Sequence, residues 1–378
     1  RFVDFGSYTI VLNFMYNTYC SIRFWSGGAR AWHVTGNPIN SQNMAGRACQ
    51  LGEVYKSRIY LGGDTSKEGN SSRLYFSDVI STSGIVSWDK TLNMVDINPG
   101  DGEGMTGLKR FSAELLVFKP NYIYRFRTSG VDPDPLIKVG TRSHESIVEG
   151  KRGLYFHHDT GFYRYSGGYP KEISRPIQDF VEAIPYSQYD SIEAWNDNDH
   201  IYWSIGQLSI AEARETVAWK NVVLRYTESS DIWTVYSYAN EIRRGMTFNN
   251  GSEITRIVGT DHGVVATFNS GTTDFGEAIK YRLRTKWYEW EGISNRKIIE
   301  ELIGICEKAQ GSVVMCRTDE NLEWRPIGQL RKFVSHFRKQ NIRFHRIMFQ
   351  VTGISKDEAM IFQGFEILKG INEGVIED

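Results

Sequence analysis

The chain has 378 residues, a formal net charge of −1 and a hydrophobic fraction of 40%. Its near-neutral charge gives no general attraction to nucleic acid or to a membrane surface. No apolar run reaches the roughly 18 residues that a membrane-spanning helix needs. Aromatic residues make up 13%, and 36 glycines stand against 9 prolines. This composition favours an all-β protein of short strands and tight turns, with enough chain for one large domain or several smaller ones.

The beginning of the sequence and the cysteines limit the cellular setting. Asp4 and Asn13 interrupt the apolar start RFVDFGSYTIVLNF, and no small-residue cleavage site follows, so no signal peptide is predicted. The four cysteines follow no C-x-x-C pattern; they are Cys20, Cys49, Cys306 and Cys316. Cysteines this sparse are predicted to be buried thiols, and no metal or other cofactor is expected.

Strand-like runs recur along most of the chain. Examples are RIYLG (58–62), ELLVF (114–118), GFYRY (161–165) and GVVATF (263–268), separated by turn residues such as DTG, NDND and NNG. Short β runs with turns at this density are typical of a sandwich, a barrel or a propeller.

An internal repeat favours the propeller. YFHHDTGFYRYSGG (155–168) aligns with VGTDHGVVATFNSG (258–271) through an apolar run, Asp-x-Gly, a second apolar run and Gly. The spacing fits two units of roughly 50 residues, which is typical of propeller blades. LRYTESSDIWTVYSY (224–238) matches a kelch-type hairpin without the kelch double glycine. We therefore prefer a β-propeller to a pair of sandwiches.

Helix signals are few. In ISRPIQDFVEAIP (173–185), Ser174 is expected to cap a helix. Its apolar stripe consists of Ile177, Phe180, Val181 and Ile184. A second short helix is expected within SIAEARETVAW (209–219).

The C-terminal part of the sequence has a different pattern. Its strand-like runs within 297–328, 343–353 and 360–370 lack the Asp-x-Gly unit. We therefore expect a β-propeller over residues 1–280 and a β-sandwich-like module over 281–378, with few short helices.

Three segments resemble virion proteins of tailed bacteriophages. They are RLYFSDVISTSGIVSWDKTLNMVDINPGDGEGMTGLKRFSAELLVFKPNYIYRF (73–126), GLYFHHDTGFYRYSGGYPKEISRPIQDFV (153–181) and VGTDHGVVATFNSGTTDFGEAIKYRLRTKWYEW (258–290). In that family a D-G-x-x-I-T-G-L turn precedes an L-L-V-F-K strand, and an I-S-x-P-I helix follows a D-G hairpin. The resemblance covers about residues 55–300.

The resemblance implies a propeller-type tail, connector or nozzle component. Such a protein forms a ring, often sixfold, around the channel through which DNA leaves, and acts as a structural protein and not as an enzyme. The implied partners are copies of itself, other tail, connector or portal-proximal proteins, and genomic DNA in transient passage. The implied location is the virion tail, after assembly in the host cytoplasm.

Three polar stretches are candidate metal sites. His157 and His158 are neighbours on a predicted strand, so their side chains point to opposite faces and cannot easily bind one ion. NPGDGEG (98–104) lacks the spacing of a calcium loop, and a turn between blades is expected there. WNDNDHIYW (195–203) is interpreted as an Asx-rich turn that enters a strand. No metal-binding residue is therefore predicted.

Glycan chemistry is the alternative function. Propeller glycosidases need paired carboxylates, and the sequence has no recurring Asp box, because Asp78 and Gly84 are too widely spaced. No catalytic motif is found and no catalytic residue is predicted. A carbohydrate-binding or glycan-cleaving β-propeller that recognises a host receptor remains the alternative.

One segment has a strongly uneven charge. RPIGQLRKFVSHFRKQNIRFHR (325–346) contains no acidic residue and has phenylalanines among its basic residues. The candidate interface residues are Arg325, Arg331, Lys332, Phe333, Phe337, Arg338, Lys339, Arg343 and Arg346. Basic residues among aromatics could contact nucleic acid, but tight phosphate binding would hinder DNA release, so we prefer a protein interface.

Overall fold

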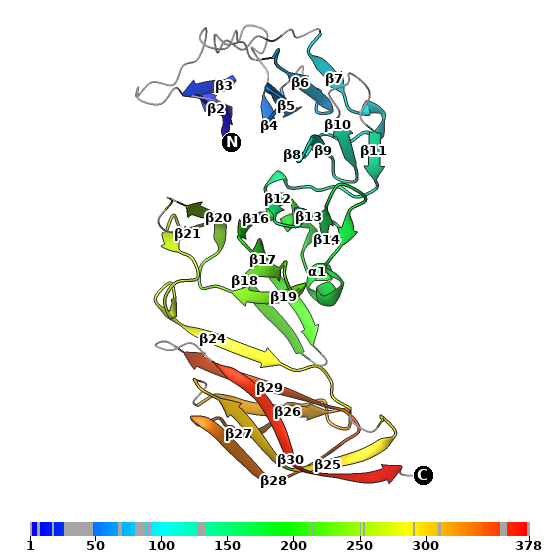
Figure 1. The fold of residues 1–378 in the computed structure, drawn as a ribbon, viewed down its shortest axis with the longest axis vertical. Helices are drawn as coiled ribbons and strands as arrows, with labels where there is room; N and C mark the ends of the chain where they lie inside the picture. The colour runs from blue at the N-terminus through cyan, green and yellow to red at the C-terminus, as the bar shows by residue number, and fades with distance from the viewer. Residues whose placement is uncertain are drawn as a thin grey trace. The chain divides into compact units, whose positions relative to one another are not determined.

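The structure is a computed structural model of the chain. It describes residues 2–5, 8–16, 19–25, 48–66, 70–79, 88, 92–126, 134–212, 215–249, 251, 254–289, 292–308, 311–355 and 361–375. The chain divides into two compact units (Figure 1). The first comprises Arg1–Ile210 and Thr216–Ala266, and the second comprises Ala211–Glu215 and Thr267–Asp378. The main part of the second unit thus begins earlier than the expected division after residue 280.

The first unit consists of antiparallel sheets of three or four strands, each formed by strands that follow one another in the chain. The first sheet contains β1 (Phe2–Phe5), β2 (Tyr8–Tyr16) and β3 (Tyr19–Trp25). The second sheet contains β4 (Cys49–Tyr55), β5 (Arg58–Asp64), β6 (Arg73–Phe76) and β7 (Met94–Asp96). The third sheet contains β8 (Gly107–Phe111), β9 (Glu114–Phe118), β10 (Ile123–Phe126) and β11 (Asp134–Ile137).

The next three sheets continue this order. The fourth sheet contains β12 (Val148–Gly150), β13 (Gly153–His158), β14 (Gly161–Tyr165) and β15 (Lys171–Glu172). The fifth sheet contains β16 (Glu193–Asp197), β17 (His200–Glu212), β18 (Glu215–Thr227) and β19 (Ile232–Ser237). The sixth sheet contains β20 (Ile242–Asn249), β21 (Ile254–Thr260) and β22 (Val265–Thr267). The first strands of successive sheets are neighbours: β4 lies beside β8, β12 beside β16 and β16 beside β20. Meandering sheets joined through their first strands are the blades of a β-propeller.

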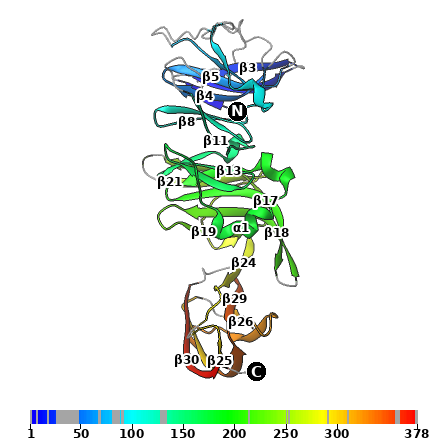
Figure 2. The ribbon, with the colours of Figure 1, turned by 90° about the vertical axis from the view of Figure 1, so that its right-hand side faces the viewer.

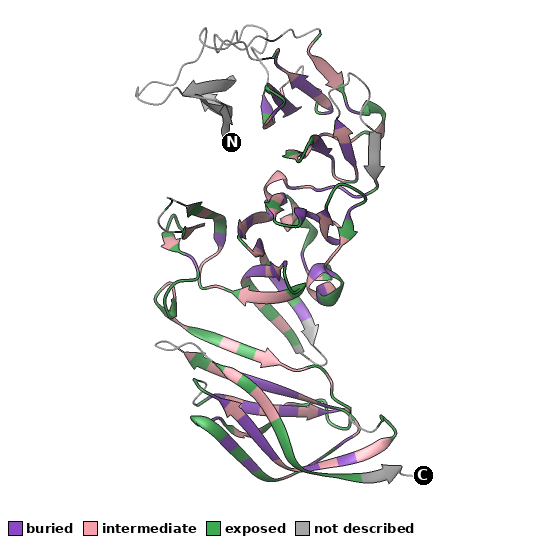
Figure 3. Cartoon of the chain, viewed as in Figure 1, coloured by how far each residue is buried: buried purple, intermediate pink, exposed green. Residues whose placement is uncertain are grey.

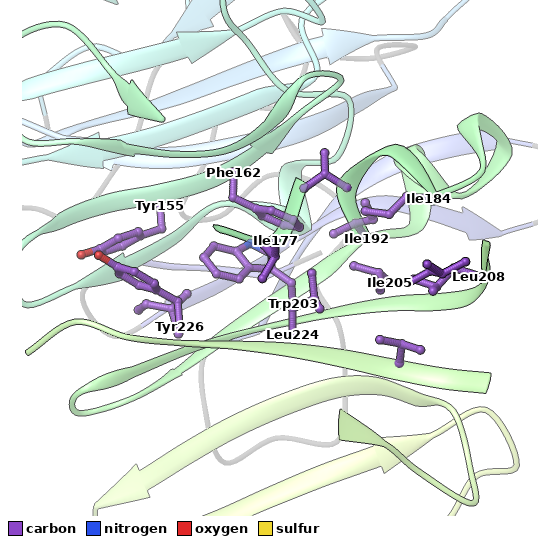
Figure 4. Packing of buried hydrophobic residues seen from close by; sticks show 14 residues of the cluster. Tyr155, Phe162, Ile177, Ile184, Ile192, Trp203, Ile205, Leu208, Leu224 and Tyr226 are labelled. Carbon is purple, nitrogen blue, oxygen red and sulfur yellow. The ribbon is translucent and has the colours of Figure 1, made fainter. Parts of the chain in front are cut away.

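Aromatic side chains pack one blade against the next. Tyr60 of β5 contacts Phe126 of β10 at 5.5 Å between ring centroids, and Phe118 of β9 contacts Phe156 of β13 at 5.3 Å. Between the fourth and fifth sheets, Trp203 lies 4.7 Å from Phe162 (Figure 4). Figure 2 shows the strands of these two sheets beside each other. Burial of large aromatic rings therefore joins blades that share no sheet hydrogen bonds.

A buried carboxylate also joins the fourth and fifth blades. Glu228, which follows β18, is fully buried. Its two oxygens accept hydrogen bonds from the backbone amides of Lys151 at 3.0 Å and Arg152 at 2.8 Å. One oxygen also accepts the Tyr155 hydroxyl at 2.8 Å. Glu228 thus holds the β12–β13 turn, and these bonds satisfy its charge inside the protein.

The repeated Asp-x-Gly segments form equivalent hairpins. Asp159 lies in the turn between β13 and β14, and Asp261 lies in the turn between β21 and β22. Each hairpin joins the second and third strands of its sheet, and the two sheets are two blades apart. The interpretation of two blade units between these segments is therefore confirmed.

The two helix predictions had different outcomes. Residues 173–185 form a 3₁₀ turn, η4 (Arg175–Ile177), and the single α-turn α1 (Gln178–Glu182), and Ile177, Val181 and Ile184 enter the core. Ser174 stands at the N-cap position of η4, as expected, but its side chain makes no capping bond: the hydroxyl accepts the Phe162 amide at 3.1 Å. The helix expected at 209–219 is wrong, because the described residues of this segment, 209–212 and 215–219, belong to the long strands β17 and β18.

The remaining short helical turns are η2 (Pro99–Asp101), η3 (His144–Ser146) and η5 (Tyr186–Ser191). No helix among the described residues is long and apolar enough to cross a membrane. Cys49, Cys306 and Cys316 are buried, as predicted. The side chain of Cys20 lies outside the described part of the chain.

The second unit has two sheets, as a sandwich-like module requires. One has the order β23-β24-β29-β26-β27 and the other β28-β25-β30. Their strands are β23 (Thr273–Asp274), β24 (Glu277–Arg284), β25 (Asn295–Cys306), β26 (Val313–Thr318), β27 (Arg325–Gln329), β28 (Phe333–Phe344), β29 (Ile347–Ser355) and β30 (Phe362–Val375). Buried and exposed residues alternate along several of them (Figure 3). The buried side chains, among them Leu302, Phe337 and Phe349, form one apolar core.

Candidate functional site

The paired histidines are core residues of a blade. Both His157 and His158 are buried. The His157 ring packs against Phe162 at 5.0 Å and Tyr189 at 4.9 Å, and its Nε2 atom has no hydrogen-bond partner among the residues that the structure describes. Burial lowers the pKa of His157 to about 3, so the ring stays neutral. His158 accepts a hydrogen bond from the Gly140 amide at 3.4 Å.

Asp159 belongs to an ion pair. The Arg142 guanidinium donates to both of its carboxylate oxygens, at 2.9 and 3.1 Å from Nε. The same guanidinium lies 4.7 Å from the centre of the Tyr186 ring. The segment that suggested a metal site thus forms a packed hairpin with a partly exposed ion pair.

The glycine-rich loop at 98–104 is held by a lysine. The Lys119 ammonium is buried and donates to both oxygens of Asp101, at 2.7 and 2.8 Å, and to the Asn98 carbonyl at 3.0 Å. Tyr124 also donates to Asp101, at 3.0 Å. The position that a cation would occupy beside Asp101 is taken by the ammonium group. The loop is the connection between the second and third blades.

The WNDND segment is likewise structural. Asp197 ends β16 and pairs with Arg256 at 2.6 Å, while Asp199 accepts the Ser229 hydroxyl at 2.5 Å. Within the described ranges, no group of three or more His, Cys, Asp and Glu side chains could hold a metal ion.

Charged residues from three successive blades meet near the first strands. Arg244 on β20 pairs with Glu145 in η3, and its Nε lies 3.3 Å from Glu193 on β16. Burial raises the pKa of Glu193 to about 7, although the Arg244 charge acts in the opposite direction. No local sequence pattern predicts this pair of carboxylates, because its members lie about 50 residues apart. A carboxylic acid that titrates near neutrality is a candidate proton donor.

Most residues of the predicted basic interface are exposed. Arg325, Arg331, Lys332, Arg338, Lys339, Arg343 and Arg346 are all in the exposed class. Arg338 pairs with Glu301 at 2.9 Å, and Phe333 is 60% exposed. Phe337 was predicted to belong to the interface, and this prediction is wrong: its side chain points into the core of the second unit and is only 6% exposed. The alternation of faces along β28 separates Phe337 from Arg338.

The same sheet has two edge strands that carry some exposed apolar side chains. β28 and β30 flank β25, so each has one side without a neighbouring strand within the described part of the sheet. Phe333 and Val334 on β28 are exposed. On β30, Ile367, Leu368 and Ile371 are 38%, 47% and 41% exposed. Long edge strands with exposed apolar side chains favour pairing with another chain.

The second unit also contains a row of arginines and tryptophans that the sequence patterns did not predict. The Arg317 guanidinium lies 5.2 Å from the Trp287 ring and 4.9 Å from the Trp324 ring. Arg346 lies 5.9 Å from Trp287, and Arg284 lies 5.2 Å from Trp324. We call Arg346, Trp287, Arg317, Trp324 and Arg284 the Arg–Trp ladder. Its members come from four separate segments, and only the aromatic-rich KWYEW and NLEWR stretches indicate it in the sequence.

Comparisons with known proteins give similarities of low score. No protein-family model matches the chain, and no curated protein matches it. An exo-β-1,3-galactanase from Phanerochaete chrysosporium matches with a TM-score of 0.31 and 9% identity, over 96% of this chain and 93% of that one. A chain of the mitotic checkpoint complex matches at 0.42 and 8%, over 69% and 71%. Hsv2 from Kluyveromyces lactis matches at 0.37 and 10%, over 69% of each chain. These scores carry no argument about function.

Proposed function

We propose that this chain is a structural component of a bacteriophage tail or connector. It forms a ring around the DNA exit channel and docks neighbouring virion proteins, and it acts by assembly and not by catalysis. The proposed location is the virion, after assembly in the host cytoplasm. The resemblance to tailed-phage virion proteins suggests the family. Its segments lie in the second and third blades, in the fourth blade, and in the sixth blade with the start of the second unit.

The observation that carries the proposal is the pair of edge strands with exposed apolar side chains in the second unit. Pairing β30 with an edge strand of another copy would satisfy its free backbone groups and cover Ile367, Leu368 and Ile371. A head-to-tail contact of this kind repeats from copy to copy and closes into a ring when the rotation permits it.

The mass in solution and negative-stain images of the purified chain test the proposal. We expect a ring-shaped oligomer with an axial channel. Leu368→Lys and Ile371→Lys should shift the mass toward the monomer, because they place charges in the contact. Val265→Lys, at an exposed position of the first unit, serves as the control and should leave the oligomer intact. A strict monomer that binds glycans with micromolar affinity would disprove the proposal.

The Glu145–Arg244–Glu193 cluster favours one second candidate, a glycan-cleaving propeller. Glycosidases use two carboxyl groups, one of which must be protonated near neutral pH, and Glu193 has such a pKa. Against this, Arg244 engages both carboxylates. Release of reducing sugar from an oligosaccharide panel, lost in Glu193→Gln but kept in Glu149→Gln, would support this candidate.

A further inference from the structure

The Arg–Trp ladder fixes cationic groups in a row. A guanidinium stacked on an indole ring is held by cation–π attraction, and its plane is thereby oriented. Hydrogen bonds support both ends: Arg284 Nε donates to Gln350 at 2.5 Å, which fixes that side chain, and the Arg346 backbone amide donates to Asp319 at 3.0 Å, which fixes the backbone that carries the other arginine. The row is therefore arranged before any partner arrives, which reduces the entropy that binding loses.

Two acids close to the ladder in sequence have partners other than its guanidinium groups. Asp319 accepts hydrogen bonds from backbone amides and lies 3.5 Å from His345. Glu320 pairs with Arg296 at 2.9 Å. Arg346 is exposed, and its guanidinium forms no ion pair with any residue that the structure describes. The exposed end of the ladder is therefore positively charged.

We propose that the Arg–Trp ladder is a docking site for a carboxylate-rich segment of a partner protein. Planar guanidinium groups match carboxylates through two parallel N–H···O bonds. Proteins that bind single-stranded nucleic acid stack bases on open aromatic faces. Here each indole already contacts two guanidinium groups, which leaves little ring surface for a base. The proposal does not depend on ring formation.

The test measures binding of a fluorescent hexaglutamate peptide to the full chain by anisotropy. We expect Arg346→Gln to weaken binding about five- to tenfold, because one charge-assisted pair is lost. Arg346→Lys should recover only part of the affinity, since it restores the charge but not the planar fork. Lys308→Gln is the control: Lys308 is exposed in the same unit but belongs neither to the ladder nor to the predicted basic interface, and its loss should change little.

Two results would overturn the proposal. One is equal affinity of the wild type, Arg346→Gln and Lys308→Gln for hexaglutamate, or no binding at all, which would leave the ladder a purely structural feature. The other is tighter binding of an oligothymidylate that Arg346→Gln abolishes, which would make the ladder a nucleic-acid site. Equal thermal midpoints of the variants show that each result comes from the surface and not from unfolding.

Discussion

Lys119 and Asp101 form an ion pair inside the propeller, with Nζ 2.7 Å from Oδ1 and no exposed surface on the lysine side chain. Asp101 belongs to a connecting loop and Lys119 follows strand β9, so the pair fixes the loop to the next blade. Burial alone would raise the pKa of Asp101, but the hydrogen bonds from Lys119, the Glu103 amide and Tyr124 together lower it. The charge of Asp101 is thus maintained inside the protein by its neighbours.

Lys119→Met should destabilise the first unit. It leaves Asp101 charged and buried without its main partner, which costs about 3–5 kcal/mol in proteins of this kind. Urea unfolding followed by tryptophan fluorescence measures the loss. Lys138→Met, at an exposed lysine, should change the free energy of unfolding by less than about 0.5 kcal/mol. A loss below about 1 kcal/mol in Lys119→Met would contradict the importance of the pair.

His157→Phe should make the protein less sensitive to acid. The folded-state pKa of His157, about 3, lies below its ordinary value of 6.5. Its neutral ring therefore contributes stability that is present above pH 6.5 and lost as the pH falls toward 3. At pH 4 the wild type should have lost about 2–3 kcal/mol through this group. Phenylalanine keeps the packing and removes that loss.

Thermal midpoints at pH 7 and pH 4 compare the wild type with His157→Phe. His262→Phe is the matched control, because His262 is 70% exposed in the other Asp-x-Gly turn. The control should keep the pH dependence of the wild type. Parallel pH profiles for the wild type and His157→Phe would show that His157 is not the acid-sensitive group.

Glu193→Gln should change the pH dependence in the opposite sense. Because the folded-state pKa of Glu193 is raised from 4.5 to about 7, its contribution is present below pH 4.5 and lost as the pH rises through 7. The amide cannot ionise, so the variant should gain up to about 3 kcal/mol relative to the wild type between pH 5 and pH 8. Differential scanning calorimetry at both values measures this. Glu149→Gln, at an exposed glutamate, should show no such gain.

Gly245→Ala should weaken the packing between the fifth and sixth blades and lower the stability of the protein. A Cβ atom at position 245 would lie 2.3 Å from the Trp195 ring, which covers this glycine. The clash should cost about 1–3 kcal/mol. Gly259→Ala is the control on the paired strand, because nothing lies within 4 Å of its Cβ position. Equal melting temperatures of the two variants would show that Trp195 moves aside freely.

Local patterns in the sequence predicted the local structure well. The period of two in a strand separated His157 from His158, and the structure confirms the strand. The repeated Asp-x-Gly turns identified equivalent hairpins two blades apart. The segment at 209–219 was predicted wrongly because alanine, glutamate and arginine favour helices, while pairing within the sheet decided its conformation.

The polar clusters could not be predicted because their members are distant in the sequence. Lys119 and Asp101 meet only when the connecting loop folds against the end of β9. Phe337 lies between His336 and Arg338 in the sequence, yet its side chain faces the core because β28 presents alternate residues to opposite sides. The Arg–Trp ladder joins residues from Arg284 to Arg346, and no local spacing rule connects them.

Glu228 constrains the order in which parts of the chain can fold during synthesis on the ribosome. The turn amides of Lys151 and Arg152 receive their acceptor from a residue 77 and 76 positions later. At about 5–20 residues per second, these amides wait roughly 4–15 s for it during synthesis. The fourth blade therefore emerges incomplete and becomes stable only after most of the fifth has been translated. Pulse-labelling of ribosome-bound chains that end before and after residue 228 would detect this delay as late protection of the turn.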